Sequence, residues 1–251
     1  MRRSLIVWCA VSLVVAGCAT VPAPQLGESR ATGVTGSTSE PVASGDVDPD
    51  KRLAISCVSL DAAPEVRLSS LPEVWAATNY LRFAGCTAEY IGPQPFVPTA
   101  EEAAIISVAQ ASGYLGQDLL RAYLEAVEVC TRVSDETGPH GFAARGLPVL
   151  KAAAALCPRG PQGKIIAAWA TGSRIADGSY AVGATMAAGT FRTVMPRGAD
   201  GIYGCSWRVV DATGAVTEER SEVFTSSPLE VTVTAGEAFV SDQCGIWQKI
   251  D

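Results

Sequence analysis

Cysteine is the residue type whose chemistry is most informative in this chain of 251 residues, which contains eight cysteines and one histidine. Cys9 and Cys18 lie near the N-terminus, and the other six are Cys57, Cys86, Cys130, Cys157, Cys205 and Cys244. Metal binding is the alternative to disulfide formation, but zinc sites need closely spaced cysteine and histidine ligands. No C-x-x-C pair occurs, and His140 stands alone. An even number of cysteines in an exported chain favours disulfides, so we expect three bridges, no metal and no cofactor.

The connectivity of the six cysteines is open, because six cysteines permit fifteen pairings. Pairing in sequence order would close three loops of about 28 to 40 residues, each stabilising the fold by roughly 3.5–4 kcal/mol through the unfolded chain. A bridge between Cys130 and Cys157 presents a difficulty. Both residues lie near the C-terminal ends of predicted helices, whereas antiparallel neighbours bring opposite ends together.

Carboxylate pairs are the residues that could still perform catalysis. Glycoside hydrolysis uses two carboxylates about 5 to 9.5 Å apart. The candidates are Glu101/Glu102, Glu125/Glu128 and Glu218/Glu219/Glu222. The first group suits a helix N-terminus, the second a solvent-facing helix side and the third an exposed strand edge, where charge discourages aggregation. A nucleophilic hydrolase would have only His140 as its base, and G-x-S-x-G, S-x-x-K, G-x-G-x-x-G and P-loop motifs are absent. We therefore expect no enzymatic activity.

The first residues fall into three chemical zones. Arg2 and Arg3 precede an apolar run from Leu5 to Val15, and small residues follow at positions 16 and 17. This order is typical of a secretory signal. The run is shorter than the roughly 20 apolar residues that a membrane-spanning helix needs.

The string VVAGC at residues 14–18 resembles a lipobox, the cleavage site of bacterial lipoproteins. The resemblance implies a diacylglyceryl group on the Cys18 sulfur and removal of residues 1–17 as a signal peptide. Two acyl chains bind a membrane stably, whereas one binds only marginally. The other interpretation is an ordinary secretory signal in which Cys18 is incidental. We predict a protein anchored by lipid to the extracytoplasmic face of the cell membrane.

Residues 18–52 are predicted to be a disordered tether, because they contain no aromatic residue and no periodic apolar pattern. Asp46 to Asp50 has the D-x-D-x-D spacing of a calcium loop, but Lys51 and Cys57 stand where that loop needs Gly and Glu. Without the signal peptide, 17 Lys and Arg face 26 Asp and Glu, a formal charge of −9. Such a charge argues against a nucleic-acid partner.

Residues 53–175 carry helix signals and are predicted to form a small disulfide-bonded helical domain. Ser70 precedes Leu71-Pro72, which is typical of an N-cap with proline in the first turn, and this run continues to Phe83. Thr99 and Glu102 form the pattern of a capping box. Further helices are expected over residues 117–133, 148–156 and 162–173.

Residues 176–251 are predicted to form a small antiparallel β-sandwich or roll, which makes the fold α+β. The expected strands cover residues 180–182, 190–194, 203–210, 216–224, 229–234 and 239–250. Cys205 and Trp207 are two apart and share a strand face, whereas Cys244 and Trp247 are three apart, which requires a bulge at Gly245. Our interpretation is a disulfide packed between two indoles; the alternative is a tryptophan-lined ligand site.

The string DGSYAVGATMAAGTFRT at residues 177–193, followed by GCSW and CGIW, resembles a β module at the C-terminus of actinobacterial secreted proteins and lipoproteins of unknown function. Phe191 stands where that module commonly has Tyr, and Ala188 where Pro often precedes Gly. The resemblance implies export, a β fold and a bond between Cys205 and Cys244. It implies no activity.

These features predict a lipid-anchored cell-envelope lipoprotein that acts as a non-enzymatic binding or structural module. The alternative is a cell-wall or polysaccharide-acting hydrolase that uses paired carboxylates. The predicted β module has ten Asp and Glu against five Lys and Arg. Its expected partner is therefore a neutral or cationic envelope protein or glycan, in addition to membrane lipid at Cys18.

Overall fold

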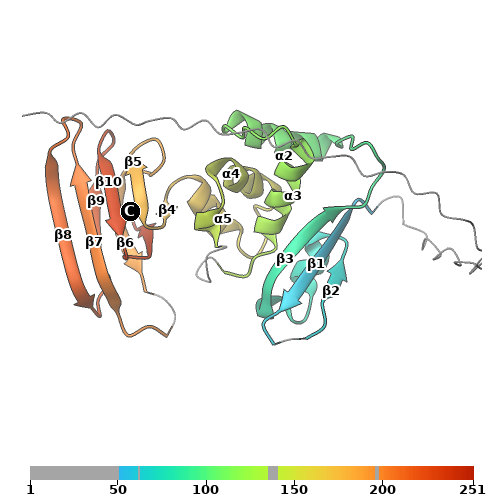
Figure 1. Ribbon diagram of the computed structural model, residues 1–251, viewed down its shortest axis with the longest axis horizontal. Helices are drawn as coiled ribbons and strands as arrows, with labels where there is room; N and C mark the ends of the chain where they lie inside the picture. The colour runs from blue at the N-terminus through green and yellow to red at the C-terminus, as the bar shows by residue number, and fades with distance from the viewer. Residues whose placement is uncertain (1–50, 62, 135–140, 196–197) are drawn as a thin grey trace, which may run out of the picture. The chain divides into compact units, whose positions relative to one another are not determined.

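The computed structural model describes residues 51–61, 63–134, 141–195 and 198–251. These residues form five α-helices and three antiparallel sheets, which confirms the α+β class (Figure 1). The predicted signal peptide, Cys18, most of the predicted tether and His140 lie outside the described residues. Within the described ranges, no helix is both long and apolar enough to cross a membrane.

The folded chain begins with a three-stranded antiparallel sheet in the order β2-β1-β3. Its strands are β1 (Leu53–Ser59), β2 (Val66–Leu68) and β3 (Phe83–Tyr90). Cys57 and Cys86 are directly paired across β1 and β3, and their disulfide joins Cα atoms 4.1 Å apart. Ile55 and Cys57 are fully buried and belong to the same apolar core as the helices.

The prediction of a wholly helical domain over residues 53–175 is wrong for this first sheet. The expected helix does begin at its Ser70 N-cap, with Pro72 in the first turn, but α1 (Leu71–Ala76) is only six residues long. Such a short helix has little local stability. A short 3-10 turn, Tyr80–Arg82, leads into β3. The sequence of β3 contains alanine and glycine, which have low strand propensity, so pairing with β1 and the disulfide determine its structure.

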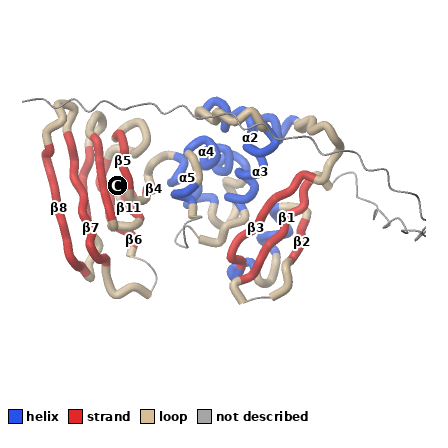
Figure 2. The backbone as a smooth tube through the Cα atoms, viewed as in Figure 1, coloured by secondary structure: helices blue, strands red, loops and turns tan. Residues whose placement is uncertain are grey.

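Four longer helices follow and confirm the remaining helix predictions to within a few residues (Figure 2). They are α2 (Ala100–Ala111), α3 (Leu119–Cys130), α4 (Leu147–Leu156) and α5 (Gly163–Ala170). Thr99 and Glu102 form the predicted capping box, in which each side chain accepts the backbone N–H of the other. The helices meet through small side chains with no exposed surface: Ala109, Ala122, Ala126, Ala152 and Ala153. Small residues let the helix backbones approach closely.

A disulfide joins Cys130 to Cys157, with Cα atoms 6.0 Å apart. Cys130 is the last residue of α3, and Cys157 directly follows α4. The C-terminal ends of these helices therefore meet, which removes the difficulty that an antiparallel arrangement would have posed.

Residues 174–249 form a β-sandwich, which confirms the predicted C-terminal module. One sheet has the order β5-β10-β7-β8 and the other β4-β11-β6-β9. The strands are β4 (Arg174–Ile175), β5 (Gly178–Ala181), β6 (Gly189–Val194), β7 (Ile202–Val210), β8 (Val216–Thr225), β9 (Glu230–Val233), β10 (Ala238–Asp242) and β11 (Ile246–Lys249). Phe239 from the first sheet and Phe191 and Trp247 from the second are fully buried in one shared core.

The end of α5 is hydrogen-bonded directly to the sandwich. The Lys249 N–H donates to the Ser173 carbonyl at 2.8 Å, and the Ala187 N–H donates to the Gly172 carbonyl at 3.0 Å. Gly172 has a φ of +69°, and a Cβ there would lie 2.7 Å from the Thr185 carbonyl oxygen. Only glycine fits this close approach. The predicted boundary near residue 175 is thus a tightly bonded turn.

Candidate interaction surface

The Cys205–Cys244 disulfide expected from the resemblance is present and lies in the core of the sandwich. Both cysteines are at most 2% exposed, and Trp207 and Trp247 are 3% and 0% exposed. The two indoles meet edge to face, with ring centroids 6.3 Å apart. Because neither indole reaches the surface, the alternative of a tryptophan-lined ligand site is wrong.

The three-residue spacing of Cys244 and Trp247 comes from a change of sheet. The predicted strand over residues 239–250 is in fact two strands, β10 and β11, which belong to opposite sheets. Cys244 lies in the turn between them, where Gln243 and Gly245 have φ values of +55° and +82°. The turn inverts the side-chain direction, so Trp247 can face the same core without a strand bulge.

Asp177 holds this turn in place. Its carboxylate accepts the backbone N–H groups of Cys244 and Gly245 at 3.0 and 2.9 Å and the Ser241 hydroxyl at 3.1 Å. Sequence reasoning missed this role, although Asp177 is the first residue of the string that carries the resemblance to secreted β modules. The aspartate is therefore a structural residue of the module.

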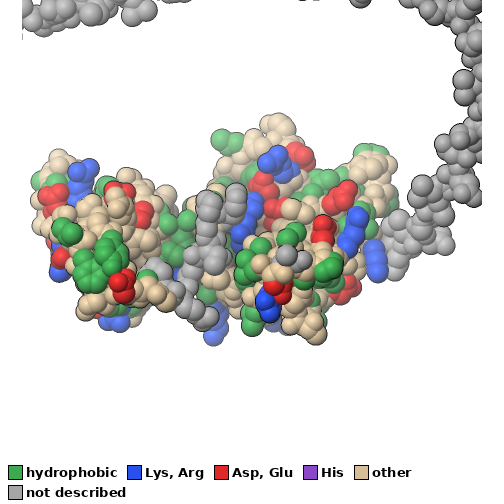
Figure 3. All heavy atoms as spheres, turned by 60° about the horizontal axis from the view of Figure 1, so that its bottom comes forward, with side chains coloured by type: hydrophobic (Ala, Val, Ile, Leu, Met, Phe, Trp, Pro, Cys, Tyr) green, Lys and Arg blue, Asp and Glu red, His purple; other side chains and the backbone are tan. Residues whose placement is uncertain are grey.

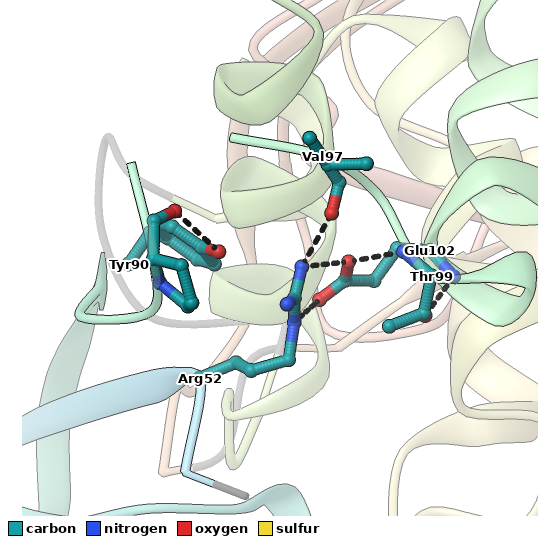
Figure 4. Close-up of polar contacts among 6 residues, drawn as sticks. Arg52, Tyr90, Val97, Thr99 and Glu102 are labelled. Carbon is teal, nitrogen blue, oxygen red and sulfur yellow. Dashed lines mark hydrogen bonds and ion pairs between the residues drawn. The ribbon is translucent and has the colours of Figure 1, made fainter. Parts of the chain in front are cut away.

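Glu102, one of the candidate catalytic carboxylates, belongs to a partly buried ion pair (Figure 4). Its side chain is 6% exposed and accepts hydrogen bonds from Arg52 Nε and Nη2 at 2.9 and 2.8 Å. Arg52 also donates to the Val97 carbonyl at 2.8 Å, and its guanidinium lies 5.1 Å from the centre of the Tyr90 ring. Arg52, predicted as the last tether residue, therefore belongs to the folded part. Glu101 is exposed beside this pair.

The other candidate carboxylates lie on two further elements. On α3, Glu125 accepts a hydrogen bond from Arg121 at 2.9 Å, and Glu128 pairs with Arg145 at 3.3 Å. On β8, Glu222 pairs with Arg220 at 2.6 Å. The three groups thus occupy α2, α3 and β8 separately. Among the described residues, no cluster of three or more His, Cys, Asp or Glu side chains could hold a metal ion.

The β8 strand is the exposed edge of its sheet. It pairs with β7 on one side only, and eight of its ten residues are exposed. Figure 1 shows it as the outermost strand of the sandwich. An edge strand presents unpaired backbone N–H and C=O groups, which can pair with another extended chain.

Tyr203 and Phe224 form an exposed aromatic pair across β7 and β8. Their ring centroids are 4.8 Å apart, and the side chains are 57% and 46% exposed. The neighbouring Val223 is 88% exposed. The Tyr203 hydroxyl donates to Asp200 at 2.8 Å, and this hydrogen bond raises the pKa of Tyr203. Figure 3 shows apolar side chains gathered on the sandwich surface, which is typical of an interaction site.

The charges of β8 restrict what can pair with it. The strand carries three glutamates and one arginine, a net charge of −2. Glu218 and Glu222 stand opposite Val209 and Cys205 of β7, whose side chains are buried, and so belong to the inward face of the sheet at its edge. Inward-pointing charges at an edge disfavour pairing with an apolar strand. A strand with basic side chains would complement them.

Comparison with known proteins finds a family match that covers the sandwich. A family model described as an Rv1352-like extracellular domain matches residues 173–248. The match begins just before β4 and ends within β11, so it includes Asp177, the Cys205–Cys244 disulfide and β8. No curated protein and no solved structure matches the chain. The C-terminal module is therefore similar to an extracellular domain, as expected for a secreted protein.

Proposed function

We propose that this chain is a lipid-anchored, non-enzymatic binding protein on the extracytoplasmic face of the cell membrane, and that β8 holds its partner. The partner is an envelope protein that adds an extended, basic segment beside β8 as a further strand. The exposed edge of β8 is the observation that carries the binding role. The V-A-G-C string supports the anchor, and the similarity of residues 173–248 to an extracellular domain supports the location.

A peptide segment suits β8 better than a glycan for two physical reasons. An added strand gains affinity from main-chain hydrogen bonds and specificity from alternate side chains. The free edge of β8 offers the first. Glu218 on one face of the strand and Glu219 on the other offer the second for Lys or Arg side chains, while Glu222 already pairs with Arg220. The exposed pair of Tyr203 and Phe224 adds an apolar contact at one end of the strand.

A non-enzymatic role is supported by the state of the candidate carboxylates. Glu102, Glu125, Glu128 and Glu222 are each paired with an arginine. The Glu102 pair serves the packing of the chain, because it joins the residue preceding β1 to the start of α2. No observation favours the hydrolase alternative.

Binding at β8 can be tested with short synthetic peptides. The protein used in this test begins at residue 19 and therefore contains every described residue. An alternating Lys-Val peptide of ten residues is expected to shift the backbone amide NMR signals of β8. Methylation of alternate peptide nitrogens should weaken binding, because it removes the donors that an added strand needs. Replacing the lysines by glutamates should abolish it.

The matched variants are Val223→Lys and Leu115→Lys. Both side chains are highly exposed, at 88% and 91%, but Leu115 lies between α2 and α3. Val223→Lys should weaken the basic peptide through charge repulsion, and Leu115→Lys should not. On intact cells, a photo-crosslinking residue at position 223 should capture a protein that the same residue at position 115 does not capture. Peptide binding that survives both N-methylation and Val223→Lys contradicts the proposal. Backbone amide NMR signals of β8 that do not shift when the peptide is added contradict it as well.

A further inference from the structure

A groove beside the first sheet is lined by two arginines. It has a volume of about 280 Å³. Its walls come from β1, β3 and α3 and from three residues outside these elements, Glu65, Arg132 and Arg145. The polar residues that line it are Ser56, Glu65, Thr87, Glu128, Arg132 and Arg145.

The backbone of Arg132 is fixed beside this groove, and its side chain has no ion pair or hydrogen bond to the described residues. The Arg132 N–H donates to the Val129 carbonyl at 3.2 Å, and the Tyr80 hydroxyl donates to the Arg132 carbonyl at 2.8 Å. These bonds hold the backbone. The side-chain Nε is buried and makes no hydrogen bond to the described part of the chain. A buried donor that lacks a partner is costly, and a charged one more so.

The surrounding charges leave positive charge at Arg132. Arg145 Nη2 lies 3.3 Å from one oxygen of Glu128, and the other oxygen accepts the Ala88 N–H at 3.4 Å. Glu128 is thus shared between Arg145 and the backbone of β3. Burial lowers the pKa of Arg132, and the like charge of Arg145 lowers it further, while Glu128 acts in the opposite direction. Glu65, the other carboxylate of the groove, is exposed.

We propose that this groove binds an oxyanion, a carboxylate or phosphate group, through the guanidinium of Arg132. The planar fork of arginine matches both anions. Ser56 and Thr87 also line the groove, and they stand opposite each other on β1 and β3, so their hydroxyls share one face of the sheet. The site shares no residue with β8, so it goes beyond the proposed function and is tested independently of it.

Inorganic phosphate and acetate serve as the two probes, each titrated into the chain that begins at residue 19 at constant ionic strength. At least one should raise the thermal unfolding midpoint, because a ligand that binds only the folded state stabilises it. Arg132→Gln should weaken that binding by about tenfold or more, the usual effect of losing a hydrogen bond to a charged group. Arg192→Gln is the charge-matched control. It removes a half-exposed arginine from β6 and should leave anion binding unchanged.

A second variant separates binding from folding. Arg132→Met should unfold at the same urea concentration as the wild type or a higher one, because it removes an unpaired charge from a half-buried place. It should also lose the response to the anion. A response to phosphate alone or to acetate alone identifies the class of anion. The proposal is overturned if neither probe acts, if Arg132→Gln binds as the wild type does, or if Arg132→Met loses its fold.

Discussion

At the scale of single residues, two partly buried arginines differ in the partners of their side-chain donors. Arg52 places its guanidinium against the Glu102 carboxylate, the Val97 carbonyl and the Tyr90 ring, so its Nε, its Nη2 and its planar face have partners. Arg132 has only its backbone groups bonded within the described residues. An arginine that is paired in the way Arg52 is can be explained by the fold alone. An arginine that lines a groove and has no side-chain partner among the described residues is the arrangement that suits a ligand.

Removing Arg52 should therefore destabilise the protein more than removing an ordinary surface arginine. Arg52→Met leaves the buried carboxylate of Glu102 without its bidentate partner, and we expect a loss of about 2 kcal/mol in the free energy of unfolding. Urea denaturation is the appropriate measurement, because guanidinium salt would screen the pair. Replacing both partners in Arg52→Met/Glu102→Met should recover part of the loss, since no uncompensated charge remains.

Arg67 provides the control for this measurement. It pairs with Glu89 at 3.4 Å, but both side chains are exposed, at 65% and 73%. Exposed pairs contribute little, so Arg67→Met should change the free energy of unfolding by less than about 0.5 kcal/mol. Equal effects of Arg52→Met and Arg67→Met would show that the Glu102 pair adds nothing to stability.

At the scale of elements, the disulfides of the sheet and the sandwich differ in access to solvent. In Cys57–Cys86, Cys86 is partly exposed and lines the groove, whereas Cys57 is fully buried. The cysteines of the other two bridges are all at most 2% exposed. Thiol–disulfide exchange needs access to a sulfur. The β1–β3 bridge is therefore the one that a reductant can reach without unfolding.

We expect a low concentration of dithiothreitol under native conditions to reduce Cys57–Cys86 first. Alkylation of the released thiols followed by peptide mass spectrometry reads the order of reduction. The matched control is the same reaction in urea above the unfolding transition, where all three bridges should react at similar rates. Earlier reduction of Cys205–Cys244 under native conditions would mean that the sandwich opens more readily than the first sheet.

Local signals explain which elements could be predicted from the sequence. The capping box of Thr99 and Glu102 marks the start of α2, and the alternation over residues 230–234 marks β9, because both patterns are encoded by neighbouring residues. The first sheet could not be found in this way. Its strand β3 has an unremarkable sequence and is defined by pairing with β1, a partner about thirty residues away. Non-local pairing overrides local propensity here.

The candidate surfaces also divide into features that neighbouring residues encode and features that depend on distant segments. The acidic run on β8 was predicted as an exposed strand edge, because three glutamates near one another in a strand cannot all be buried. The roles of Asp177 and Arg132 could not be predicted. Asp177 caps a turn near residue 244, and Arg132 lines a groove together with residues of β1 and β3. Both roles depend on segments that only the fold brings together.

At the scale of the whole molecule, the cysteines divide into two chemical classes. Six are joined in three disulfides in the order in which they occur along the chain. Without Cys9, which belongs to the predicted signal peptide, Cys18 is the one cysteine that these bridges do not use. The disulfide count thus leaves Cys18 available for the lipid that the V-A-G-C string implies. The anchor and the fold should therefore be separable by mutation.

Replacing Cys18 by serine tests that separation, because serine cannot form the thioether to the lipid. In cells, Cys18→Ser should be released from the membrane fraction or accumulate as an unprocessed precursor, while all three disulfides still form. Carbonate washing, N-terminal sequencing and non-reducing electrophoresis read these outcomes, and Cys9→Ser is the matched control that should leave anchoring unchanged. If Cys18→Ser stays with washed membranes and is still cut before residue 18, attachment has another cause.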